Sequence, residues 1–86
     1  MNAFLYCVCV FKSADLQSYK ILVITDILST ISKDKTSDTL LYIRHYTSMQ
    51  DAIGHKLFLE SISSSSLENQ ILAINPKLKN LKELFN

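Results

Sequence analysis

The stretch from Leu40 to Glu60 constrains the fold most, because its apolar pattern changes from that of a strand to that of a helix. Residues 40–46 are rich in large apolar and aromatic side chains and indicate a partly buried strand. Ser48 and Asp51 follow with the spacing of a capping box. Apolar residues then recur at helical spacing, and we expect one broad side of a helix to carry Met49, Ala52, Ile53, Leu57, Phe58 and Leu59. A strand that leads into a capped helix, each with an apolar side, is a core unit.

Two further strands are indicated before this unit. Phe4–Phe11 is almost continuously apolar, as in a central strand that is covered on both faces. Tyr19–Ile24 has the composition of a second strand, and the short polar connection predicts an antiparallel hairpin. Thr25 and Asp26 are suitable N-caps for a helix that begins near Asp26. The segment 33–39, which has mixed charge, is expected to be a solvated loop.

Two more helices are predicted after Glu60. Ser65–Glu68 has the spacing of a capping box and predicts a helix that begins near Ser66, with a buried face of Leu67, Ile71 and Ile74. Asn75 should end this helix, since the residue before a proline is disfavoured in the α region. Asn75 is also expected to cap a last helix that begins at Pro76. The inner face of that helix would consist of Leu78, Leu81, Leu84 and Phe85.

The predicted order is strand, strand, helix, strand, helix, helix, helix, which indicates an α+β fold with a three-stranded, largely antiparallel sheet flanked by helices. Residues 1–86 are expected to form a single domain, because typical domains hold about 100–150 residues. A hydrophobic content of 48% argues against a disordered segment. The apolar run near the N-terminus is too short for a membrane span and has no basic segment before it, so we expect no membrane partner and a cytoplasmic location.

Few residues indicate chemistry. The net charge of +1 lacks the basic excess that is typical of proteins that bind phosphate backbones. Cys7 and Cys9 would share one face of a strand near the far limit for a disulfide, so we interpret them as core residues. His45 and His55 are interpreted as structural or exposed residues rather than metal ligands. Gly54, inside a predicted helix, suggests close packing against a neighbouring element.

Several motifs resemble those of the small GIY-YIG endonucleases. Cys7–Leu22 is similar to the first two strands of that family. Thr25–Ile27 stands where the family has an Asn-Asp-Leu helix start, and Leu41–Tyr42 with the Ser48–Ala52 cap resembles its third strand and helix entry. Asn75–Leu81 is similar to its closing Asn-Pro-x-Trp-x-x-Leu. The motifs are collinear over nearly the whole chain, and the resemblance implies a GIY-YIG-like domain.

The same resemblance implies that the catalytic residues are replaced. The family cuts DNA with two tyrosines, an arginine, often a histidine, and a glutamate that binds a metal ion. The corresponding positions here are Cys9 and Lys20 for the tyrosines, Thr30 for the arginine, Asp34 for the histidine and Lys56 for the glutamate. An ammonium group has no lone pair for a divalent cation and repels it. We therefore expect no metal site, no cofactor and no nuclease activity.

Three functional hypotheses remain. The first is an inactive family member that serves as an interaction module for a protein partner or for a second copy of itself. The second is a module that binds nucleic acid without cutting it, which a clustered basic face would support. The third is a hydrolase with a rebuilt site around Cys9, Lys20 and Lys56, which an open cleft and a lowered pKa at Cys9 would support. A small shift of strand register would instead bring Tyr6 or Tyr19 to the site.

Overall fold

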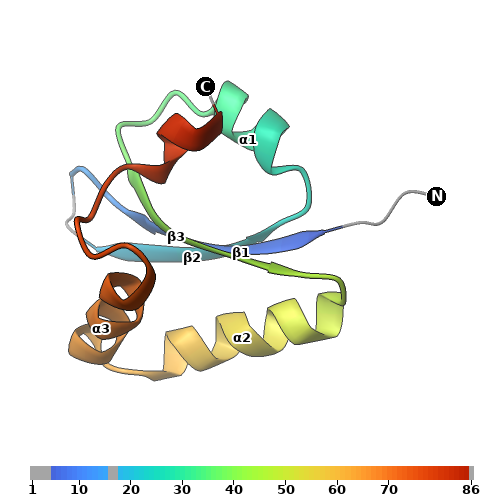
Figure 1. Cartoon of the computed structure of the whole chain (residues 1–86), viewed down its shortest axis with the longest axis vertical. Coiled ribbons are helices and arrows are strands. Elements are labelled where there is room, and N and C mark those ends of the chain that lie inside the picture. The colour runs from blue at the N-terminus through green and yellow to red at the C-terminus, as the bar shows by residue number, and fades with distance from the viewer. Residues whose placement is uncertain (1–4, 16–17, 86) are drawn as a thin grey trace.

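The computed structural model describes residues 5–15 and 18–85, which form a sheet covered by helices on both faces (Figure 1). The predicted α+β class and the predicted strands are confirmed; Phe4, where the first strand was expected to begin, lies outside the described residues. The elements are β1 (Tyr6–Lys12), β2 (Tyr19–Ile24), α1 (Ile27–Lys33), β3 (Thr39–Tyr46), α2 (Met49–Ser61), α3 (Ser64–Ile74) and the 3₁₀ helix η1 (Leu81–Phe85).

β1 lies in the middle of the sheet and pairs in antiparallel fashion with β2 on one side and β3 on the other. This position explains its continuous apolar sequence, because residues 7–11 are buried on both faces. The register between β1 and β3 shifts between Val10 and Phe11, and Leu41 has no direct partner in β1. Such a bulge increases the local twist of the bulged strand.

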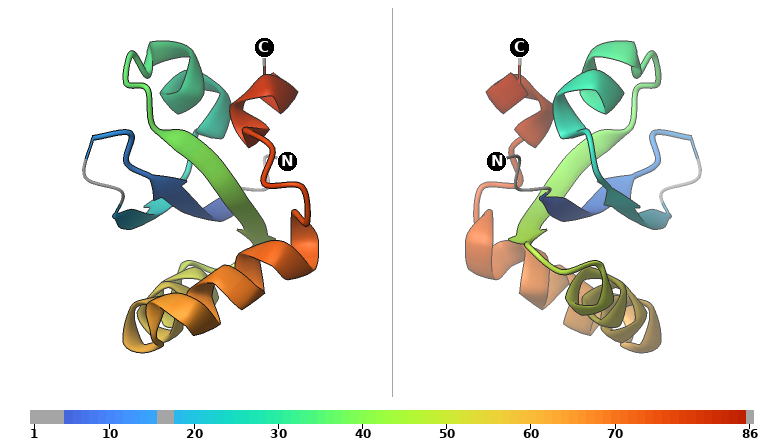
Figure 2. Two further views of the ribbon diagram at one scale, coloured as in Figure 1. Left: turned by 90° about the vertical axis from the view of Figure 1, so that its left-hand side faces the viewer. Right: turned by 90° about the vertical axis from the view of Figure 1, so that its right-hand side faces the viewer.

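The sheet separates two apolar cores. α2 and α3 cover one face, and α1 and η1 cover the other (Figures 1 and 2). Because successive side chains of a strand point to opposite faces, Val8 and Val10 enter the core under α2 and α3, whereas Cys7 and Cys9 enter the core under α1 and η1. Both cysteines are free and buried, which confirms their interpretation as core residues.

Short polar side chains begin the helices. Asp26 and Ser48 each accept a hydrogen bond from the backbone N–H three residues later, so the predicted caps of α1 and α2 are confirmed. The prediction for α3 is wrong by two residues. Its N-cap is Ser63, whose hydroxyl accepts a hydrogen bond from the Ser66 N–H at 3.2 Å, and its first residue is Ser64. The run of serines offers several similar caps, and the packing of the helix selects among them.

The prediction of a helix that begins at Pro76 is wrong. The chain forms a turn there, and η1 begins only at Leu81. Asn75 ends α3 as its C-cap, as predicted, but it begins no further helix, and its side chain is buried. Its Nδ2 donates to the backbone oxygens of Leu41, at 3.1 Å, and Lys79, at 2.9 Å, and its Oδ1 accepts from the Lys79 N–H at 3.0 Å. These bonds hold the connection between α3 and η1 against β3.

The apolar residues of α2 are divided between the core and the surface. Ala52 and Leu59 are buried, but the rest of the predicted apolar side is exposed, namely Met49, Ile53, Leu57 and Phe58. The prediction of close packing at Gly54 is wrong, because a Cβ added there would meet no atom within 4 Å.

Within residues 5–15 and 18–85, no helix combines the length and the apolar character that a membrane span requires.

The apolar residues near the C-terminus are divided in the same way. Leu81 and Phe85 pack against the core under α1, as predicted. Ile74, Leu78 and Leu84, which were also predicted to be buried, are exposed. Leu78 lies in the turn before η1 with a φ of 51°, a conformation that residues with a side chain adopt uncommonly.

Candidate functional site

A groove beside β2 and α1 brings together three of the five positions that the family resemblance marks as degenerate. Lys20 comes from β2, Thr30 from α1 and Asp34 from the C-cap of α1. They line a groove of about 430 Å³ together with Phe11, Leu22, Lys33, Thr36 and Asp38. The other two positions, Cys9 and Lys56, do not line it.

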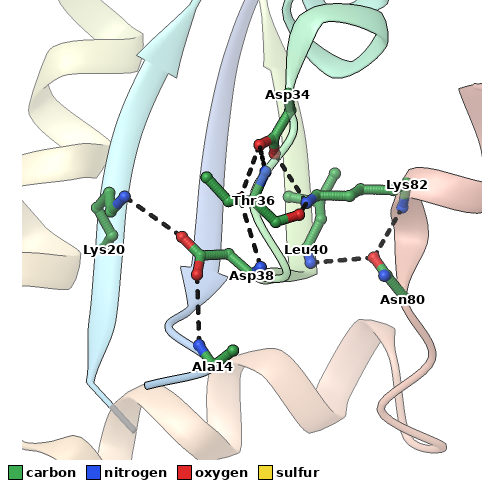
Figure 3. Close-up of polar contacts among 8 residues, drawn as sticks. All are labelled: Ala14, Lys20, Asp34, Thr36, Asp38, Leu40, Asn80 and Lys82. Atoms are coloured by element: carbon green, nitrogen blue, oxygen red, sulfur yellow. Dashed lines mark hydrogen bonds and ion pairs between the residues drawn. The ribbon is translucent and has the colours of Figure 1, made fainter. Parts of the chain in front are cut away.

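The carboxylate of Asp38 connects two segments at this groove (Figure 3). Its Oδ2 lies 3.4 Å from Lys20 Nζ, and its Oδ1 accepts a hydrogen bond from the Ala14 N–H at 3.3 Å. The segment 33–39, predicted to be a solvated loop, is therefore held against the hairpin of β1 and β2. Both oxygens of Asp38 are engaged by groups of the chain itself.

Asp34 is engaged in the same manner by Lys82 and Thr36 (Figure 3). Its Oδ2 lies 2.7 Å from Lys82 Nζ, and its Oδ1 accepts from the backbone N–H and the hydroxyl of Thr36 at 2.8 and 2.7 Å. Burial by itself raises the pKa of Asp34, but the hydrogen bonds of Lys82 and Thr36 and the charge of Lys82 outweigh it and lower the pKa to about 2. A carboxylate with this pKa does not transfer protons near neutral pH.

Sequence reasoning missed Asp38, Asn80 and Lys82 as parts of this network. The Asn80 Oδ1 accepts from the backbone N–H of Leu40 at 3.1 Å and from that of Lys82 at 3.2 Å, and so fixes the start of η1 beside β3 (Figure 3). No spacing in the sequence signals a contact between residues forty positions apart. In the described part of the chain, no group of three or more His, Cys, Asp or Glu side chains is placed to hold a metal ion.

Cys9 lies beneath the groove in the closed core. It pairs with Leu22 of β2 and is fully buried. Burial, and to a smaller degree the neighbouring Cys7, raises the pKa of the Cys9 thiol to about 12. The thiol is therefore protonated at neutral pH and has no access to solvent. The open cleft and lowered Cys9 pKa that would support a hydrolase rebuilt around Cys9, Lys20 and Lys56 are therefore not found.

Lys56 lies on α2, on the other side of the sheet from the groove (Figure 1). Its Nζ is 3.0 Å from Oε1 of Glu60, one helical turn away. Tyr6 and Tyr19, the alternatives that a shifted register would offer, also pack on the side of α2 and α3. The Tyr19 hydroxyl donates to Glu68 at 3.1 Å. None of these side chains lines the groove, so only Lys20, Thr30 and Asp34 of the family positions come together.

The two histidines lie apart from each other and from the groove. His55 of α2 is held between two tyrosines of β3: its Nε2 is 3.1 Å from the Tyr42 hydroxyl, and its Nδ1 contacts the Tyr46 hydroxyl. Burial and the charge of Arg44 lower the pKa of His55, so the ring is neutral at pH 7. His45 is exposed on β3. His55 is thus a structural residue that bridges strand and helix, although its tyrosine partners were not predicted.

Three of the lysines are paired with carboxylates. Lys20, Lys56 and Lys82 lie within 3.4 Å of a carboxylate oxygen. Lys20 and Lys56 also belong to opposite sides of the sheet. These three lysines therefore do not form a basic face for nucleic acid.

Comparisons with known proteins give a likeness in fold. No protein-family model matches the chain, and no curated protein matches it. Among solved structures, the chain is similar to the UPF0213 protein BH0048 from Bacillus halodurans, whose solution NMR structure aligns with a TM-score of 0.69. The sequences are 15% identical, and the alignment covers 93% of this chain and 96% of that one. At this identity the likeness shows the fold alone, a small α+β domain with a three-stranded antiparallel sheet and helices.

Proposed function

We propose that residues 1–86 form a catalytically inactive GIY-YIG-like domain that serves as an interaction module and associates with a second copy of itself through α2. The observation that carries this proposal is the row of exposed apolar side chains along one side of α2. On the side of α1, the candidate groove holds carboxylates that are already paired with lysines. On the side of α2, Met49, Ile53 and Leu57 are exposed along the helix.

Loss of catalysis follows from the chemistry of phosphodiester hydrolysis. The reaction needs a metal ion or an equivalent cation at the phosphate, and donors for the charge that develops in the transition state. Thr30 carries no charge, both oxygens of Asp34 are engaged by Lys82 and Thr36, and Lys56 lies on the other side of the sheet. Loss of one such electrostatic group typically reduces the rate about 10²–10³-fold.

The exposed side of α2 supports the interaction role. The exposed apolar residues recur every four positions, at Met49, Ile53 and Leu57, and therefore lie along one side of the helix. Phe58 lies further around the helix, and Gly54 stands between it and this row. Leu57 is 58% exposed. Gly54 stands near the midpoint of α2 with open space beside it, so two antiparallel copies of α2 can approach closely about a two-fold axis there. A second copy is accordingly the partner we expect.

The size of this face indicates weak association. A helix of 13 residues is about 20 Å long and about 10–12 Å wide with its side chains. One such face is well below the roughly 800 Å² per partner of a standard stable interface. We therefore expect a monomer–dimer equilibrium at micromolar to millimolar concentrations.

The catalytic part is tested with supercoiled plasmid, Mg²⁺ or Mn²⁺, and the purified protein beside a Lys56→Ala variant. Neither protein should nick the plasmid above background. Nicking by the wild type that disappears in Lys56→Ala would show a rebuilt active site, and the proposal of an inactive domain would then be wrong.

Self-association is tested by sedimentation velocity over a range of concentrations. Leu57→Lys should abolish the dimer, because it places a charge in the apolar face. Leu28→Lys, at a leucine of α1 that is 62% exposed, is the matched control and should dimerise like the wild type. A wild type that stays monomeric at millimolar concentration, or equal behaviour of the two variants, would contradict association through α2.

A further inference from the structure

A second unpartnered surface lies along the outer edge of β3. The beginning of this edge is covered, because Leu40 donates its N–H to Asn80 and the Leu41 carbonyl accepts from Asn75. Successive backbone groups of a strand point to alternate sides, so an outward carbonyl at Leu41 places the N–H and C=O of Ile43 and His45 outward as well. Within residues 5–15 and 18–85, no loop or side-chain hydrogen bond reaches these groups.

An apolar groove of about 540 Å³ runs beside this open edge. Ile43, Arg44 and His45 of β3 line it, Ile74 at the end of α3 borders it, and Leu84 is among the apolar side chains that η1 contributes. Leu84 is 72% exposed and Ile74 is 52% exposed. The other edge of the sheet, β2, adjoins grooves with several charged side chains instead. An open strand edge next to exposed apolar side chains has the properties of a site for strand addition.

The rims of the groove favour a single extended segment over a second copy of β3. A second copy would bring its own Leu84 and Ile74 against the same rims. In the antiparallel register that pairs Ile43 with His45, Arg44 would also stand directly opposite Arg44 of the other copy, and like charges in that position are destabilising. An extended peptide has no flanking helices and meets neither obstacle.

The charge of Arg44 restricts the sequence of such a peptide. Arg44 is exposed, and no carboxylate among the described residues forms an ion pair with it. A peptide residue opposite Arg44 would point to the same face of the sheet as Arg44, whereas its two neighbours would point to the face of Ile43 and η1. We propose that the β3 edge binds an extended peptide with the pattern apolar–acidic–apolar, through backbone pairing with Ile43 and His45 and an ion pair with Arg44.

This inference rests on the proposed interaction role and adds a partner of defined chemistry to it. It is tested with a fluorescein-labelled peptide of alternating Val and Glu, and binding is measured by fluorescence polarisation. NMR should show shifts of the Ile43 and His45 amides on titration. Leu84→Ser should weaken binding at least tenfold, whereas Leu28→Ser, the matched exposed leucine of α1, should not.

Three further measurements separate the alternatives. N-methylation of alternate peptide amides should abolish binding, because it removes the donors for strand pairing. Arg44→Glu should reverse the preference, so that a Val and Lys peptide binds better than the Val and Glu peptide. Leu57→Lys should bind the peptide like the wild type, and so failure of the α2 dimer is distinguishable from failure at the β3 edge. The proposal is overturned if the amide NMR signals of Ile43 and His45 do not shift up to millimolar peptide. It is also overturned if Leu84→Ser converts a dimer of the chain into a monomer, because the edge would then bind a second copy.

Discussion

Asn75 is expected to contribute more to stability than any surface polar residue of this chain. The side chain makes three hydrogen bonds of 2.9–3.1 Å to the backbone of Leu41 and Lys79, and it is 5% exposed. Asn75→Ala removes all three, and it leaves the buried Leu41 carbonyl and the part-buried backbone groups of Lys79 without these partners. A net hydrogen bond contributes about 0.5–1.5 kcal/mol, and each orphaned group adds to the loss, so we expect destabilisation of about 2–4 kcal/mol. A domain of this size has a total of about 5–10 kcal/mol.

The assay is urea unfolding followed by circular dichroism, with Asn75→Ala, Asn75→Asp and Asn69→Ala compared with the wild type. Asn75→Asp should be at least as harmful at pH 7, because a carboxylate oxygen would face the two carbonyls to which Nδ2 now donates. Asn69 is exposed on α3, and its replacement should change the free energy of unfolding by less than about 0.5 kcal/mol. A loss below about 0.5 kcal/mol for Asn75→Ala would refute the reasoning that these bonds hold the connection after α3 against β3.

Two further predictions concern stability. Ile71→Ala should reduce the free energy of unfolding by about 2–5 kcal/mol in the same assay, because Ile71 is fully buried between α3 and the sheet; an unchanged midpoint would contradict this. The pKa of Asp34 is lowered from 3.8 to about 2 in the folded chain. The ionised Asp34 therefore stabilises the fold above pH 4, and this stabilisation is lost as the pH falls from 4 to 2. Asp34→Asn should therefore cost about 1–2 kcal/mol at pH 7, with a difference from the wild type that shrinks in acid; a difference independent of pH would argue against the Lys82 ion pair.

Part of the candidate site was predictable because its members are close in sequence. Lys20, Thr30 and Asp34 meet since β2 runs directly into α1, and a short connection brings the two elements together. Lys56 follows from the same motifs but lies on the helix after β3, and the face of the sheet that this helix covers is not encoded in the motif spacing. The lysines that neutralise Asp34 and Asp38 were not predictable, because those contacts join elements distant in the chain.

Local patterns in the sequence determined the strands, their order and the caps of α1 and α2, because propensity, periodicity and capping act over a few neighbouring residues. Tertiary structure decided which apolar residues are buried. The apolar residues of α2 exceed what one side of a helix can place against the sheet, and so Leu57 and Phe58 remain at the surface. Tertiary structure also decided the role of the Asn75 side chain, which the sequence predicted to cap a helix at Pro76. The side chain instead donates to the Leu41 carbonyl at the bulged edge of β3, and this acceptor is in place only once the sheet has formed.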